Sequence, residues 1–351
     1  MNRRLLVASV LGLVLLAIPG AALALAASAK KSQPDLTVMS RNLYLGADII
    51  QLASAPDLAA EKANAKTLHA TVDKTNFALR AKALAREIAT YRPDVIALQE
   101  VARYFRSADA TPGQKATTPL YDWMKLLQKQ LRARHQTYTD AAEQTEMDIT
   151  VPSDDGYNLR LKLGNAVLVR GGSGAKVKVT GKLAGNFAAA NQLHLTLKDG
   201  QAVQLTRGYA GIDGTIAGKK FRFLAPHAEA YSAAAAKGQF GELLAGAAKI
   251  TSRPVIIAGD FNSDPNDPEP NAYKAVIAGG FVDTGKRVAT CCQNEFLSNP
   301  ASELKTWIDH IVVRPKAKVL SGKVFGNRPS DRIGGLWPSD HAGVTATIRL
   351  G

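Results

Sequence analysis

Several short apolar runs in this chain end in polar or charged side chains. In the clearest, at 255–262, apolar and β-branched residues continue without a break through Gly259 into Asp260, Phe261 and Asn262. A run of this length and composition predicts a short buried strand. A buried strand that presents an acid and a carboxamide at its carboxyl end is a rigid support for a metal ion or a phosphate oxygen.

Four other segments share this pattern. They are Asp35–Asn42 with Arg41 and Asn42 at its end, 94–100 with Gln99 and Glu100, 307–313 with Asp309 and His310, and 338–344 with Ser339, Asp340 and His341. Burying a charged side chain in an apolar strand is unfavourable unless it is paired or bound to a metal. We therefore expect the polar residues of these segments to meet in one functional site.

Other stretches carry a helical period. In 76–92 the apolar residues Phe77, Ala81, Leu84 and Ile88 recur at spacings of four and three, and a proline follows. This pattern predicts a helix over 76–92, and similar patterns predict helices over 120–134 and 232–250. Helix followed by buried strand occurs twice, which favours an α/β layered fold.

The segment between 159 and 223 has a different pattern. Apolar and polar residues alternate in short runs such as 177–179 and 193–197, and glycine-rich turns separate the runs. This is typical of an antiparallel β meander. Because helices and hairpins are interleaved along the chain, we expect one mixed domain over 30–351 with a β-rich insertion around 171–220.

The first 29 residues have the features of a secretory signal peptide. Arg3 and Arg4 precede an apolar stretch from Leu5 to Leu25, and small residues in the A-x-A pattern follow. We therefore expect a secreted protein that lacks residues 1–29. An uncleaved membrane anchor is the alternative, because the apolar stretch approaches the ~20 residues that span a bilayer.

Composition adds a charge of +14 at pH 7 and two adjacent cysteines, Cys291 and Cys292. A strongly basic chain attracts anionic partners: nucleic acid, phospholipid surfaces or phosphorylated small molecules. Adjacent cysteines rarely bridge each other without strain, so we expect free thiols. Five arginines are candidates for phosphate contacts: Arg41, Arg103, Arg106, Arg207 and Arg222.

Taken in order, the motifs resemble those of the endonuclease/exonuclease/phosphatase superfamily, which includes pancreatic deoxyribonuclease, inositol polyphosphate phosphatases and bacterial sphingomyelinases. The resemblance covers 36–350: the family's first asparagine matches Asn42, its Gln-Glu pair matches Gln99-Glu100, and its Gly-Asp-x-Asn motif matches 259–262. Its later buried aspartate matches Asp309, and its closing Ser-Asp-His matches 339–341. The segment 42–48 and the Cys-Cys-Gln at 291–293 resemble an exported bacterial subgroup.

One match departs from the family's pattern. The family's mid-chain Thr-His-Leu is Pro226-His227-Ala228 here. Proline has no N–H and fixes its own φ, so the local hydrogen bonding must differ. The resemblance nevertheless implies a catalytic role for His227.

The resemblance implies two packed mixed β-sheets flanked by helices, a four-layer α/β/β/α sandwich with the site at one open end. It also implies metal-dependent cleavage of a phosphoester. Glu100, with Asn42 and Asp340 near it, would bind the metal. These ligands are all oxygen atoms, which favours Mg²⁺ or Mn²⁺ over zinc.

The remaining motif residues would perform the chemistry. Asp309 would orient the His341 imidazole through one ring nitrogen. Asp260 would position or deprotonate the attacking water, and Asn262 would donate a hydrogen bond to the phosphoryl oxygen. Either Asp260 or His341 can be the base, because the two form a coupled site. His310 is left out, because successive strand residues face opposite ways.

These residues predict a secreted, metal-dependent phosphodiesterase that acts on an anionic phosphoester as a monomer. A nuclease is the first expectation, because phosphate contacts by basic side chains dominate nucleic-acid binding. Alternatives are a phosphatase or a sphingomyelinase or phospholipase-C-like hydrolase, which would need an exposed apolar element for membrane lipid. From another class, a catalytically silent binding protein of the same fold is the remaining alternative.

Overall fold

The computed structural model describes residues 34–351 except for 112, 250–251, 270, 286 and 316. The predicted signal peptide lies outside the described residues. Gln33–Gly351 clusters as one unit by its internal contacts. Among the described residues, no helix combines the length and the apolar character needed to cross a bilayer.

The first sheet has eight strands in the order β15-β16-β1-β2-β6-β3-β4, and β5 also pairs with β6. Its strands are β1 (Asp35–Asn42), β2 (Val95–Gln99), β3 (Arg103–Arg106), β4 (Thr118–Asp122), β5 (Tyr138–Pro152), β6 (Asn158–Arg170), β15 (Ala317–Phe325) and β16 (Gly343–Leu350). Strand β1 runs parallel to β2 and places Asn42 opposite Gln99. The parallel pairing therefore brings the carboxyl ends of two predicted site strands together.

The second sheet has six strands in the order β13-β14-β12-β11-β10-β7. Its strands are β7 (Val177–Asn186), β10 (Gly208–Ile216), β11 (Lys219–His227), β12 (Val255–Asp260), β13 (Val282–Asp283) and β14 (Asp309–Arg314). Strand β12 places Asp260 opposite His227 on its parallel neighbour β11 and opposite Asp309 on its antiparallel neighbour β14. Three predicted catalytic residues are thus side by side at one end of this sheet.

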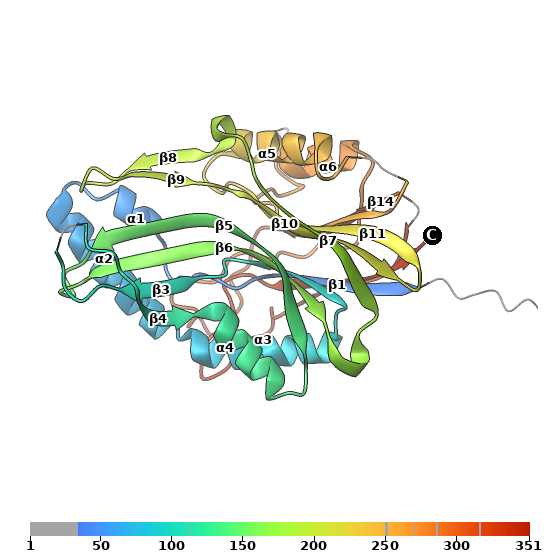
Figure 1. Ribbon diagram of the computed structural model, residues 1–351, viewed down its shortest axis with the longest axis horizontal. Coiled ribbons are helices and arrows are strands. Elements are labelled where there is room, and N and C mark those ends of the chain that lie inside the picture. The colour runs from blue at the N-terminus through green and yellow to red at the C-terminus, as the bar shows by residue number, and fades with distance from the viewer. Residues whose placement is uncertain (1–33, 112, 250–251, 270, 286, 316) are drawn as a thin grey trace, which may run out of the picture. The chain divides into compact units, whose positions relative to one another are not determined.

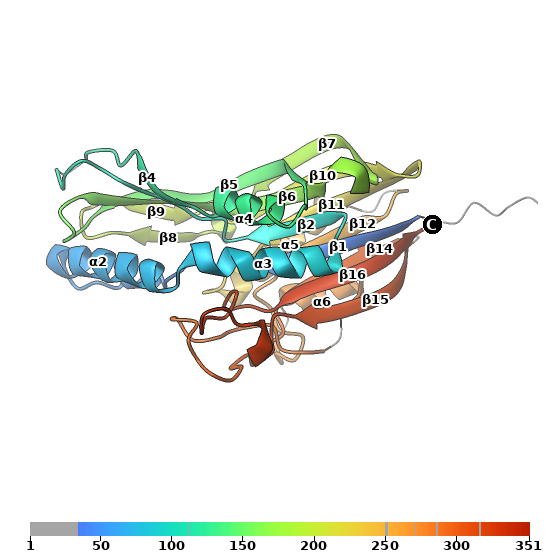
Figure 2. The ribbon, with the colours of Figure 1, turned by 90° about the horizontal axis from the view of Figure 1, so that it is seen from below.

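Helices cover the outer faces of the two sheets. They are α1 (Ile50–Ala53), α2 (Leu58–Lys74), α3 (Phe77–Tyr91), α4 (Trp123–Arg132), α5 (Ala233–Ala245) and α6 (Ala272–Ala278), with short 3-10 turns η1 (Gly172–Gly174), η2 (Ala189–Asn191) and η3 (Pro329–Asp331). Helices α3 and α4 pack on the first sheet, and α5 and α6 on the second (Figures 1 and 2). The predicted four-layer α/β/β/α sandwich is confirmed.

Alternation of side chains along the strands builds two apolar layers at once. On β1, Leu36 and Val38 face the core between the sheets, whereas Met39 packs with the helices outside. On β12, Ile256 and Ala258 face the same inter-sheet core. Full burial of one large aliphatic side chain contributes about 1.5–3 kcal/mol, so this layer fixes the positions of the strand ends.

The predicted helices form with different bounds. Helix α3 closely matches the prediction over 76–92, and α5 ends at Ala245, before Gly246. The prediction of a helix over 120–134 is wrong at its start, because 118–122 pairs with β3 as strand β4. The Asp122 side chain then accepts a hydrogen bond from the Lys125 N–H and starts α4 at Trp123.

The predicted meander over 159–223 is divided among three sheets. Strand β6 belongs to the first sheet, β7 and β10 pair in the second, and β8 (Leu193–Thr196) pairs with β9 (Ala202–Leu205) alone. The β8–β9 hairpin buries Leu197, Val203 and Leu205 in the same apolar cluster as residues of β5. Alternation identified the strands, but it contains no information on which strands pair.

Candidate active site

A cavity of about 310 Å³ opens where β2, β11 and β12 end. Six of the eight predicted site residues line it: Glu100, His227, Asp260, Asn262, Asp340 and His341. The other two, Asn42 and Asp309, contact lining residues through hydrogen bonds. Residues from distant parts of the sequence therefore converge on one place, and their roles in catalysis stay predictions.

The His341 ring lies between two carboxylates. Its Nδ1 is 2.8 Å from Asp309 Oδ2, and its Nε2 is 3.7 Å from Asp260 Oδ2. Burial alone would lower the pKa of His341, but Asp309, Asp340 and Asp260 together raise it well above its usual value. The surrounding acids therefore favour the charged imidazolium form of this ring.

Asn42 joins two of the acids. Its amide nitrogen donates to Glu100 Oε1 at 2.9 Å and to Asp260 Oδ2 at 3.2 Å, while its oxygen accepts from the Tyr44 N–H at 2.8 Å. The other Glu100 oxygen accepts from the Leu45 N–H at 2.7 Å. The amide nitrogen of Asn42, not its oxygen, thus faces the carboxylates, and its role as a metal ligand stays a prediction.

The predicted metal ligands Glu100 and Asp340 both line the cavity. Burial raises the pKa of Asp340 to about 6, and the negative charge of Glu100 adds to this rise, while the charge of His341 opposes it. A hard divalent cation prefers carboxylate oxygens and would offset the effect of the Glu100 charge on Asp340. Asp260, Asp309 and His341 are also close enough to share an ion, but Asp309 is already engaged with His341 Nδ1.

His227 belongs to a buried ion-pair network that the sequence did not predict. Its Nδ1 is 3.2 Å from Glu146 Oε2, and its Nε2 is 3.8 Å from Asp260 Oδ2. Arg207 Nη1 is 3.1 Å from the same Glu146 oxygen. Burial would raise the pKa of Glu146, but His227 and Arg207 lower it to about 2. The one sequence signal for this network is that Glu146 is an acid within the strand-forming segment 138–152.

Three cavity residues have left-handed backbone angles that glycine adopts more easily. The φ values are 58° at Tyr44, 55° at Glu100 and 44° at Asn262. Each residue follows shortly after the end of β1, β2 or β12. Such angles cost of order 1–3 kcal/mol per residue and cluster at functional sites, which supports a functional reading of this edge.

Gly259 is required by the close approach of two strands. A Cβ atom at this position would lie 2.2 Å from the Pro226 carbonyl oxygen on β11. The neighbouring Asp260 accepts from the Asn262 N–H at 2.9 Å, and the Asn262 amide donates to the Ala228 carbonyl at 3.0 Å. The Gly-Asp-x-Asn motif is thus a tightly packed turn that sets the direction of the Asp260 side chain.

The prediction of free thiols is wrong. Cys291 and Cys292 form a disulfide between adjacent residues, and the peptide bond that joins them is cis. Cys292 lines the cavity with its sulfur 4.0 Å from His341 Nε2. His310 points elsewhere, with Nδ1 2.9 Å from Asp283 Oδ2, as alternation predicted.

Four of the five candidate arginines do not line the cavity. Arg41 pairs with Glu87, Arg103 with Glu143, Arg222 with Asp213, and Arg106 lies over the Tyr157 ring. Only Arg207 lines the cavity, and it is buried. The basic charge of the chain is therefore not concentrated at the predicted site.

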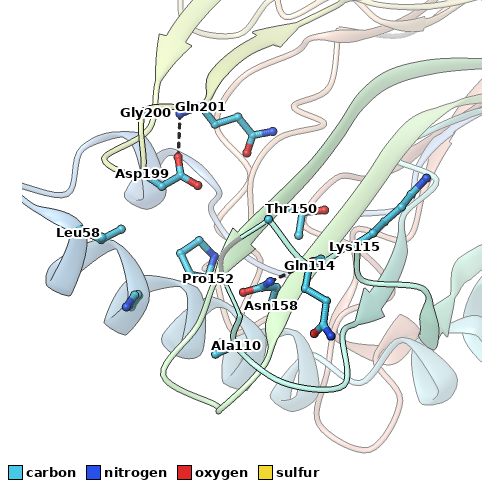
Figure 3. A pocket seen from close by; sticks show the side chains of 12 residues that line it. Leu58, Ala110, Gln114, Lys115, Thr150, Pro152, Asn158, Asp199, Gly200 and Gln201 are labelled. Atoms are coloured by element: carbon cyan, nitrogen blue, oxygen red, sulfur yellow. Dashed lines mark hydrogen bonds between the residues drawn. The ribbon is translucent and has the colours of Figure 1, made fainter.

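A larger cavity of about 680 Å³ lies between α2, the end of β5 and the turn after β8 (Figure 3). It shares no lining residue with the site cavity and has no histidine. Asp199 on its wall accepts a hydrogen bond from the Gln201 N–H at 2.9 Å, as the dashed line in Figure 3 shows. Its size exceeds that of the site cavity, but the acid–histidine chemistry is absent from its walls.

The sequence and the fold were compared with known proteins. No curated protein matches closely. One similar solved structure is an endonuclease/exonuclease/phosphatase family protein from Bacteroides thetaiotaomicron, with 17% identity over 91% of this chain and 99% of that chain and a TM-score of 0.54. Another is the D. rerio TDP2 complexed with single strand DNA product, with 18% identity over 90% of this chain and 98% of that chain and a TM-score of 0.51. A mannosyl-6-phosphatase from B. thetaiotaomicron is 19% identical over 89% of this chain and 99% of that chain, with a TM-score of 0.52.

At these identities the solved structures show the fold. The sequence itself matches the model of the Endonuclease/Exonuclease/phosphatase family over residues 64–341, which is most of the chain. This range includes the Gln-Glu pair with Glu100 and the final histidine, His341. The chain therefore belongs to the endonuclease/exonuclease/phosphatase family.

Proposed function

We propose that this protein is a divalent-metal-dependent hydrolase of phosphoesters and that the cavity at the strand ends is its active site. Members of the family act on phosphoesters, which makes hydrolysis the starting point. One observation carries the proposal: two histidines, each paired with a second buried acid, have their Nε2 atoms 3.7 and 3.8 Å from the same oxygen, Asp260 Oδ2. This arrangement supplies positive charge and a proton acceptor at a single point.

The acids of the first sheet's edge form the metal-binding part of the proposal. Glu100 and Asp340 would hold Mg²⁺ or Mn²⁺, which when bound supplies Lewis-acid stabilisation of the phosphoryl oxygens. Asn42 holds Glu100 and Asp260 in fixed positions through its amide nitrogen. Asn262 lines the same cavity; one N–H of its amide donates to the Ala228 carbonyl, and the second would donate to a phosphoryl oxygen.

The acids around His341, which favour its charged form, support Asp260 over His341 as the base. An imidazolium has no free lone pair and donates hydrogen bonds from both ring nitrogens. We assign to His341 the stabilisation of developing negative charge on the phosphoryl group, with Asp309 as its positioning residue. Asp260, close to both histidines, is then the group that orients the water and takes its proton.

Arg207 extends this positive side of the cavity. Glu146 lies 3.1 Å from Arg207 and 3.2 Å from His227, and Arg207 Nη1 lies 2.9 Å from His227 Nδ1, so the acid and the ring together hold the guanidinium in place. Burial keeps water from screening the Arg207 charge, which strengthens its effect on a phosphoryl group in the cavity.

Among the similar solved structures, the D. rerio TDP2 is complexed with a single strand DNA product, and the protein from B. thetaiotaomicron is a mannosyl-6-phosphatase. The net charge of the whole chain is the ground for expecting nucleic acid, although the basic side chains are not concentrated at the cavity. The signal-peptide pattern and the Cys-Cys-Gln segment support an exported enzyme. The substrate test must therefore contain diesters and monoesters.

The test is hydrolysis by the purified chain with Mg²⁺ or Mn²⁺. Plasmid DNA, RNA, sphingomyelin, bis(p-nitrophenyl) phosphate and a sugar phosphate are assayed in parallel. We expect turnover of at least one substrate, its loss with EDTA, and its loss in Asp260→Asn. Asp199→Asn, the same change outside the cavity, should retain wild-type turnover. Equal turnover by Asp260→Asn and the wild type would contradict the proposal.

A further inference from the structure

The mouth of the active-site cavity is acidic. Besides the acids of its floor, the lining includes Asp48 and Glu295, and Tyr231 stands beside them with half of its surface exposed. Among the described residues that line the cavity there is no lysine, and Arg207 is the single arginine. A chain with a charge of +14 thus presents carboxylates, not basic side chains, at the entrance to its site.

Of the two rim acids, Asp48 is exposed and Glu295 is half-buried. Asp48 accepts a hydrogen bond from the Ile50 N–H at 2.9 Å, and Glu295 accepts one from the Gln51 amide at 3.4 Å. Both partners are neutral, and within the described part of the chain neither acid forms an ion pair with lysine or arginine. A metal ion bound to Glu100 and Asp340 would neutralise those two carboxylates but not Asp48 and Glu295.

Such a mouth discriminates by charge. Within a Debye length, which is about 8 Å at physiological ionic strength, the rim repels any further anionic group that the substrate carries. A polynucleotide brings a phosphate on each side of the bond to be cleaved, so it would place negative charge against Asp48 and Glu295. A phosphoester with one phosphate avoids this repulsion.

Tyr231 adds an attractive element. The backbone N–H of Tyr231 donates to Glu229 Oε1 at 2.9 Å, which fixes the start of the segment that carries the ring. An exposed aromatic face near carboxylates is an environment that binds ammonium-type cations. The same face also packs against an uncharged alkyl or ring group, with less gain.

We propose that the natural substrate is a compact phosphoester whose alcohol part is cationic or neutral, and that Asp48, Glu295 and Tyr231 select it against polyanions. This inference rests on the proposed function. It gives an order of preference for substrates of equal size: cationic above neutral above anionic.

The test uses phosphodiesters that share a p-nitrophenyl leaving group and differ in one charge. The choline ester is compared with its 3,3-dimethylbutyl ester, which has the same shape with carbon in place of nitrogen. Exposed charge pairs contribute about 0.2–1 kcal/mol each, so two rim acids should raise kcat/KM for the choline ester about two- to thirtyfold at low salt. The ratio should fall toward one as salt rises.

Variants identify the residues responsible. The double variant Asp48→Asn with Glu295→Gln should bring the choline-to-dimethylbutyl ratio close to one. Asp199→Asn, a matched loss of charge at the separate cavity of Figure 3, should keep the wild-type ratio. The salt dependence of the unmodified enzyme tests the same charges without relying on the folding of any variant.

Two results would overturn this inference: equal kcat/KM for the two esters at low salt, or faster cleavage of phosphodiester bonds in DNA than in both esters. The proposed function fails separately, because in that case no phosphoester is hydrolysed with either metal. A ratio that persists at high salt would assign the selection to shape and would also contradict the role of the rim charges.

Discussion

The hydrogen bond between Asp309 and His341 gives the sharpest prediction. Asp309→Asn keeps the shape of the side chain and removes one negative charge 2.8 Å from His341 Nδ1. At an effective dielectric of about 20 and a separation of about 4 Å between charge centres, this charge is worth about 4 kcal/mol. Asp260 and Asp340 still stabilise the imidazolium.

We therefore attribute roughly 2–3 kcal/mol to the loss, which corresponds to a kcat lower by about 30- to 150-fold. The pH profile must change as well. Activity that needs the protonated ring is present below its pKa and is lost as pH rises through it. Because the substitution lowers the pKa of His341, the alkaline limb should move to lower pH.

The assay is kcat against pH with bis(p-nitrophenyl) phosphate and saturating Mg²⁺. Asp283→Asn is the matched control, since it removes the acid 2.9 Å from His310, a similar pair outside the site, and should leave both kcat and the profile unchanged. A lower kcat with an unmoved alkaline limb would refute the electrostatic role of Asp309 and leave it a purely steric one.

Three further outcomes follow from the site. In Glu100→Gln, the rise in Tm that Mg²⁺ gives the wild type should disappear, as measured by thermal shift with and without EDTA; an undiminished rise would place the metal elsewhere. In Glu146→Gln, the free energy of unfolding at pH 7 should fall, as measured by denaturant titration. The pKa of Glu146 is lowered from 4.5 in the unfolded chain to about 2 in the folded protein, so its stabilising effect is present above pH 4.5 and is lost as pH falls toward 2. The difference from the wild type should therefore shrink over this range, and a constant difference would contradict the ion pairing. In Gly259→Ala, the contact with Pro226 should cost about 1–3 kcal/mol of unfolding free energy and lower kcat by displacing Asp260, and wild-type values of both would show that β11 yields easily.

The edge of the site could be predicted because parallel strands end together. Asn42 and Glu100 follow neighbouring parallel strands, as do His227 and Asp260, so a sequence that identifies the strands also places these four residues near one edge. The inter-sheet core follows equally from alternation. The residues whose positions follow from the strand pattern thus lie where that pattern predicts.

The partners of His227 could not be predicted in this way. Glu146 lies in a long strand whose pairing with β6 shifts register between Asp140 and Ala142 and again between Thr145 and Met147. Each shift changes which residues face the core, and no local pattern marks it. The position of Glu146 beside His227 therefore depends on how β5 pairs with β6, which the local sequence does not indicate.

Net charge was a poor guide for a different reason. It sums over the whole chain and has no position, whereas binding depends on the charges at one entrance. Arg41, Arg103 and Arg222 are each neutralised by an acid in the fold, and the entrance itself is acidic. The expectation of a nuclease rested on the sum and stays a prediction, whereas the proposed selection against polyanions rests on the acids that line the cavity.

The left-handed backbone at Glu100 and Asn262 has a consequence for protein engineering. Glycine adopts such angles without the steric penalty of a side chain, so a screen that rewards thermostability alone should enrich glycine at both positions. The selected proteins would keep the sandwich and lose the groups that face the cavity. Clones with glycine at 100 or 262 that are thermostable but inactive would thus show that these side chains serve the reaction and not the stability of the fold.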